Sequence, residues 1–131
     1  MGVRFPSVAS RTIVGPVPAS SAEFIVALCP PLPIPGDNDS VLIHWYFTMT
    51  VGTGTTLLQV RVRRGVDTSG IALGGGGWIA AATAGNTSVV AGYFPDNPGA
   101  AGAVSYVLTM QQFTATAAGV LNDACLFAYA F

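Results

Sequence analysis

Charged side chains are scarce in this chain of 131 residues, which contains no lysine at all. Asp, Glu, Lys and Arg together make up 8% of the sequence, whereas soluble domains usually contain about 25%. This charge content is low for the surface of a soluble monomer. We therefore expect the chain to cover much of its surface with copies of itself or with a larger assembly.

Long apolar runs and basic segments are absent as well. No stretch of about 18 uninterrupted apolar residues occurs, so we expect no helix that spans a membrane, and the opening MGVRFPSVAS lacks the apolar run of a signal peptide. The net charge is −1, whereas a protein that neutralises the phosphates of a nucleic acid needs many cations. The sequence predicts neither a membrane nor a nucleic acid as partner.

Catalytic and metal-ligating side chains are few. His44 is the single histidine, while a metal site on an all-β scaffold would need several ligands of this kind. Most of the six acidic residues lie in stretches rich in Gly, Pro and Asn, where Asp first of all forms turns. The sequence therefore predicts no enzyme, no cofactor and no metal. Cys29 and Cys125 could form one disulfide, but without a secretion signal two free thiols are favoured.

The sequence has almost no apolar periodicity typical of helices. Its apolar residues alternate with period two instead, which indicates β-strands. In the clearest case, residues 41–51, Val41, Ile43, Trp45, Phe47 and Met49 fall on one face of a strand. The following VGTGTT predicts a tight turn, after which TLLQVRVRRG returns as the second strand of a hairpin.

Further strands are predicted along the rest of the chain, at residues 23–28, 71–73, 78–82, 88–94, 104–111 and 120–129. About eight strands without helices predict an all-β fold, a single jelly roll or related β-sandwich, over residues 21–131. Residues 1–20 carry three prolines among small residues, and we expect them to form an extended N-terminal arm that is not a strand.

Two groups of side chains are candidates for recognition. Arg61, Arg63 and Arg64 hold three of the five cations, and guanidinium groups suit bidentate contacts across an interface. We expect them to contact a neighbouring subunit or a capsid, together with Arg4, Phe5 and Arg11 of the arm. Separately, Trp78 and Phe94 lie at strand ends, where they could form an exposed aromatic site for a receptor or a carbohydrate.

The stretch VLIHWYFTMTVGTGTTLLQVRVRRGVDTSG combines an apolar strand, a Gly/Thr turn, a basic strand and a Ser-Gly turn. In this pattern, and in the closing VSYVLTMQQFTATAAGVLNDACLFAYAF, the chain resembles the small jelly-roll decoration (cement) proteins of tailed-phage capsids. The resemblance rests on patterning and transfers no individual functional residue. It implies a cofactor-free homotrimer on the outer capsid surface of a virion, which binds the major capsid protein and stabilises the shell, with the arm as a strap.

Two other functions fit the same composition. One is a trimeric fibre tip or a carbohydrate- or receptor-binding head that uses the aromatic residues at strand ends. The other is a main coat protein built from a single jelly roll, since some shells hold their genomes without basic arms. Self-assembly of the purified chain into closed shells would distinguish a coat protein from a decoration protein.

Overall fold

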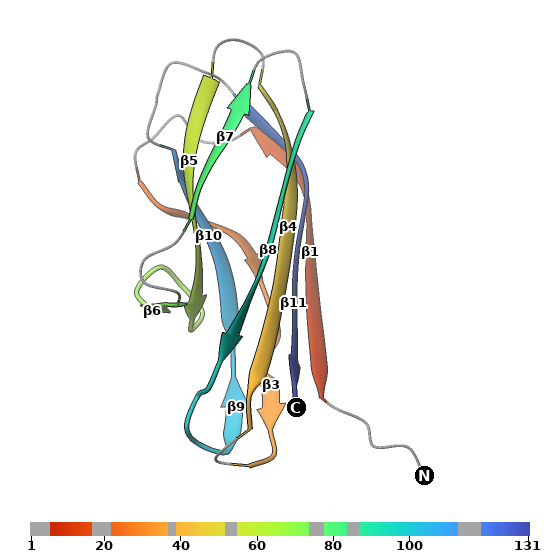
Figure 1. Ribbon diagram of the computed structural model, residues 1–131, viewed down its shortest axis with the longest axis vertical. Coiled ribbons are helices and arrows are strands. Elements are labelled where there is room, and N and C mark those ends of the chain that lie inside the picture. Colours follow the sequence, from red (N-terminus) through yellow and green to blue (C-terminus); the bar gives the residue numbers. More distant parts are fainter. Residues whose placement is uncertain are drawn as a thin grey trace.

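The computed structural model describes residues 6–16, 22–36, 39–51, 55–73, 78–83, 87–112 and 119–131, and the elements in these ranges are β-strands (Figure 1). The predicted all-β class is confirmed. Within this described part of the chain, no helix is long and apolar enough to cross a membrane. The strands are β1 (Ser7–Pro16), β2 (Phe24–Leu28), β3 (Leu32–Ile34), β4 (Val41–Val51), β5 (Thr55–Arg64), β6 (Ile71–Ala72), β7 (Trp78–Thr83), β8 (Thr87–Asp96), β9 (Gly102–Val104), β10 (Tyr106–Gln112) and β11 (Gly119–Ala130).

Two sheets face each other and form a sandwich (Figure 1). Sheet A has the strand order β1-β11-β4-β8, and sheet B has the order β2-β10-β5-β6, with β7 also paired to β5. The short strands β3 and β9 pair with each other at the end of the sandwich where the chain terminates (Figure 1).

The pairing of the eight long strands is nested. In sheet A, β1 pairs with β11 and β4 with β8, while in sheet B, β2 pairs with β10 and β5 with β7, all antiparallel. The first long strand thus meets the last, the second meets the second to last, and so on to the middle of the chain. A long antiparallel ribbon wrapped into two sheets in this way is a jelly roll. The predicted fold is confirmed.

The predicted hairpin between β4 and β5 is wrong. Both strands occur almost where the sequence places them, yet β4 belongs to sheet A and β5 to sheet B. The reason is that period-two alternation specifies which face of a strand is buried and not which strand lies beside it. Consecutive strands of a sandwich bury that face equally well by facing each other across the core.

The predicted arm is wrong over half of its length. Residues 7–16 of the expected arm, residues 1–20, form β1, which pairs with β11 from Ser7 opposite Tyr129 to Pro16 opposite Val120. β1 lies at the edge of sheet A, and an edge strand tolerates proline because one row of its backbone groups has no strand to bond. Residues 1–5 and 17–21 lie outside the described residues.

The core lies between the two sheets and comes from the alternating inward residues of each long strand. In β4 these are the predicted ones, and Val41, Ile43, Phe47 and Met49 are fully buried, with Trp45 at 4% exposure. The core residues of sheet B include Val60, Val62, Tyr106, Leu108 and Met110, each fully buried. The outward residues of the two sheets form the outer faces of the sandwich, where any functional surface lies.

Candidate functional site

The outer face of sheet B carries a cluster of charges around Glu23, which directly precedes β2. Its Oε2 accepts a hydrogen bond from Arg63 Nε at 2.7 Å, and its Oε1 accepts from Arg63 Nη2 and from Arg61 Nη1, both at 2.8 Å. Arg61 also donates to Gln59 Oε1 and Gln111 Oε1, at 2.5 and 3.1 Å. One carboxylate thereby holds two guanidinium groups in a fixed arrangement.

The cluster is largely closed to solvent. The side chains of Arg61, Arg63 and Glu23 are 15%, 16% and 14% exposed. The hydrogen bond from Arg63 is the main cause that lowers the pKa of Glu23 below its usual value, against the opposing effect of burial. Because these side chains bind one another and are about 15% exposed, they add little to the charged surface that a solitary soluble protein needs.

Arg64 has a different position, since it follows Arg63 and faces the opposite side of the strand. It donates from Nε to Asp96 Oδ2 at 3.0 Å and from Nη2 to Asp96 Oδ1, while the hydroxyl of Tyr106 donates to Oδ2 at 2.7 Å. Arg64 and Tyr106 belong to sheet B and Asp96 to sheet A. We call these three side chains the sheet clamp, because they join the two sheets at one end of the sandwich.

We predicted from the sequence that the three arginines form one interface. In the structure, Arg61 and Arg63 belong to the Glu23 cluster and Arg64 belongs to the sheet clamp. Their contact with a neighbouring subunit or a capsid stays a prediction. Arg4 and Phe5 lie outside the described residues. Arg11 is in β1, where its backbone lies opposite Cys125, and its side chain is outside the described part of the structure.

Of the two predicted recognition aromatics, Phe94 is the one whose side chain the structure describes. Phe94 is partly buried and packs against the core cluster, because its backbone position in β8 alternates with that of Tyr93. Tyr93 points outward and is 68% exposed. Trp78 begins β7, and its side chain lies outside the described part of the structure.

The outer face of sheet A gathers the exposed aromatic rings. The register places Tyr93 of β8 beside His44 of β4, and His44 beside Phe127 of β11. The His44 ring centroid lies 6.0 Å from that of Tyr93, 6.4 Å from that of Phe127 and 6.1 Å from that of Tyr129. The sequence placed His44 on the mixed face of its strand but did not reveal which strands would lie beside it.

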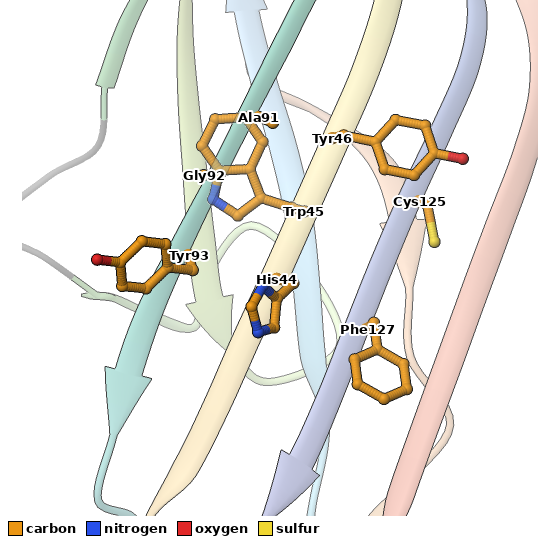
Figure 2. Close-up of a pocket in the computed structure, with 8 residues that line it drawn as sticks. All are labelled: His44, Trp45, Tyr46, Ala91, Gly92, Tyr93, Cys125 and Phe127. Carbon is orange, nitrogen blue, oxygen red and sulfur yellow. The ribbon is translucent and has the colours of Figure 1, made fainter.

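A depression of about 450 Å³ opens on this face, and Figure 2 shows eight residues that line it. Ala91 and Gly92 leave a gap in the row of side chains on β8, with Tyr93 on one side and the Tyr46 ring across β4 on the other (Figure 2). Gly92 has a packing role too, because a Cβ there would lie 2.6 Å from Cζ2 of Trp45. The indole of Trp45 thus lies directly against the backbone of β8.

The two cysteines are free thiols, as the sequence favoured. Cys29 is buried in the core and donates from Sγ to the carbonyl of Leu126 at 3.3 Å, and burial raises its pKa to about 11. Cys125 lines the depression on the outer face of sheet A. In the described part of the chain, no three His, Cys, Asp or Glu side chains gather to hold a metal ion.

The nested strand pairs and the two outward surfaces define a jelly roll in which Arg61, Arg63 and Arg64 are bound to carboxylates of the same chain. The chain is similar to a chain in the structure of infectious bursal disease virus, Gx strain, with a TM-score of 0.55 and 12% identity, over 96% of this chain and 36% of that one. A chain of the Gt strain gives a TM-score of 0.47 at 11% identity, over 96% and 35% of the two chains.

A Bacillus chain from endospore appendages described as disulfide-linked pili gives a TM-score of 0.43 at 16% identity, over 98% and 92% of the two chains. No protein family and no curated protein matches the sequence. The protein thus has the fold of the viral chain from the Gx strain and spans about a third of its length.

Proposed function

We propose that the protein is a structural component of a virion, a capsid decoration protein that binds the outer surface of the shell as a homotrimer and stabilises it. One observation carries the proposal: a jelly roll with the fold of part of a viral chain leaves apolar side chains exposed on both sheets, while three of its arginines are bound to carboxylates of the same chain. Such a surface favours burial against other subunits.

Sheet B supplies the surface that we assign to the capsid. Ile25 and Leu28 of β2 are 45% and 42% exposed, and Val66 and Ile71 beside β6 are 58% and 67% exposed. These four aliphatic side chains lie on the sheet that carries the Glu23 cluster, in which both guanidinium groups are already hydrogen-bonded to one carboxylate. A partner that covers this sheet therefore buries no guanidinium group of the cluster without its carboxylate.

The native mass of the untagged protein tests the oligomer, and immunogold labelling of intact virions of its virus tests the location. We expect a trimer, and gold particles on the outside of unopened virions. The variant Ile25→Asp/Leu28→Asp should remain folded but fail to sediment with virions, while Val89→Asp on sheet A serves as the matched control. Label found only after virions are opened would contradict the decoration role, and closed shells formed by the purified chain would make it a coat protein.

A further inference from the structure

Sheet A presents a surface of different chemistry from that of sheet B. A strip of rings runs from Tyr93 through His44 and Tyr129 to Phe131, with neighbouring ring centroids 6.0, 6.1 and 6.0 Å apart. Phe127 lies beside it, 5.7 Å from Tyr129. We call these five residues the aromatic strip. It crosses three strands of the sheet without interruption.

The strip is held in place by the fold and is open to solvent. Tyr93 is 68% and Phe131 53% exposed, and Tyr46 at the far side of the depression is 36% exposed. The rings stand on β4, β8 and β11, which are hydrogen-bonded neighbours in sheet A. A ligand that meets rings on paired strands finds them already ordered, so its binding requires little loss of conformational entropy.

The polar atoms around the depression are hydroxyl, imidazole and carboxylate groups. The Tyr46 hydroxyl donates to Asp123 Oδ2 at 3.2 Å, and in Figure 2 the hydroxyls of Tyr46 and Tyr93 point to opposite sides of His44. Among the described outward side chains of β4, β8 and β11, Asp123 is the only one that is charged whatever the state of His44. Exposed aromatic rings beside hydroxyl and imidazole groups suit a neutral ligand that carries hydroxyl groups.

We propose that this depression binds a neutral hexopyranose unit of a glycan. The C–H groups of one sugar face would lie on the ring of Tyr93, since the face of an aromatic ring carries partial negative charge. The gap above Ala91 and Gly92 admits the edge of the sugar ring, and its hydroxyls reach the polar groups of Tyr46 and His44, which line the depression. A concave, mainly apolar site with a few polar groups is the usual form of a small-ligand site.

This site goes beyond the proposed structural role and does not depend on it. A virion protein with a capsid-binding sheet B would turn sheet A toward the host cell, where glycans are the available ligands. The site also differs from the one that the sequence suggested, because the described residue Phe94 does not line it. The neighbouring residue Tyr93 is the aromatic side chain that β8 presents outward.

The test is an NMR titration of the isotopically labelled protein with four probes: methyl α-glucopyranoside, methyl α-mannopyranoside, methyl β-galactopyranoside and N-acetylglucosamine. We expect at least one probe, at millimolar concentrations, to shift the resonances of Tyr93, His44 and Gly92. Tyr93→Ala should weaken that binding by about tenfold or more, whereas Tyr93→Phe should retain most of it because the ring remains. Val89→Ala, on the same strand and face, serves as the matched control.

Three results would overturn the glycan site. The first is that no probe shifts these resonances, and the second is that Tyr93→Phe loses as much binding as Tyr93→Ala. The third is that Tyr93→Ala changes the native mass of the protein, which would assign the aromatic strip to a contact between copies. Because the decoration role is tested by the native mass of the parent protein and by capsid attachment of the sheet B variant, a failure of the glycan site is distinguishable from a failure of that role.

Discussion

Removal of a single oxygen atom from the sheet clamp should measurably loosen the sandwich. In Tyr106→Phe the ring keeps its place in the core, where Tyr106 is fully buried, but the 2.7 Å hydrogen bond to Asp96 Oδ2 is lost. A hydrogen bond to a charged group contributes about 1.5–3 kcal/mol. Asp96 remains paired with Arg64, so the loss stays within that range and should not approach the cost of an unpaired buried charge.

The corresponding change in melting temperature follows from the size of the chain. For a domain of 131 residues, about 1 kcal/mol of stability corresponds to a shift of roughly 3–5 °C. We therefore expect Tyr106→Phe to lower Tm by about 5–15 °C, measured by calorimetry at one protein concentration because an oligomer gains stability with concentration.

Tyr46→Phe provides the matched control, since it removes the same atom from an exposed hydrogen bond to Asp123. Its stability should change by less than about 0.5 kcal/mol. If Tyr106→Phe melts at the temperature of the parent protein, the clamp does not hold the sheets together and the reasoning fails. If the control loses as much as Tyr106→Phe, burial of the hydrogen bond does not determine its contribution.

The remaining predictions concern packing, pH and thiol reactivity. Gly92→Ala places a methyl group 2.6 Å from Trp45 and should cost about 1–3 kcal/mol, seen as an earlier urea midpoint by tryptophan fluorescence, whereas Ala91→Ser should change little. The pKa of Glu23 in the folded protein is lowered from 4.5, so the stability that its ion pairs contribute is complete above pH 4.5 and is lost as pH falls through the folded-state pKa. Glu23→Gln should therefore flatten the fall in urea midpoint below about pH 4.5. An equally steep fall in the variant would contradict this. At mildly alkaline pH, iodoacetamide should label Cys125 before Cys29, whose thiol pKa is about 11, and mass spectrometry that finds Cys29 labelled first in the folded protein would contradict its burial.

The strands themselves were largely predictable, because the alternation of apolar residues in each strand indicates which of its faces is buried. The bounds of β4 match the predicted residues 41–51, since five large apolar residues alternate there with polar ones. The partner of each strand was not predictable in this way. The choice of β8 and β11 as the neighbours of β4 depends on the wrapping of the whole ribbon, which no local pattern contains.

The site residues were harder to predict for two physical reasons. β8 has apolar residues at both odd and even positions, and Tyr93 faces outward while its neighbour Phe94 packs against the core, so its sequence does not reveal which face is outward. The ion pairs join residues that are far apart in sequence, such as Glu23 and Arg61. A cluster of arginines therefore looked like an interface when its carboxylate partner lay 38 positions away.

The position of β11 between β1 and β4 has a consequence for the synthesis of the protein. A ribosome delivers β1 first and β11 last, yet sheet A has no continuous hydrogen-bonded path from β1 to β4 until β11 enters between them. Until then two of its strands expose unpaired backbone groups, which are templates for pairing with other chains. Such long-range pairing folds slowly. Chains that terminate before residue 119 should therefore aggregate rather than accumulate as a smaller folded product.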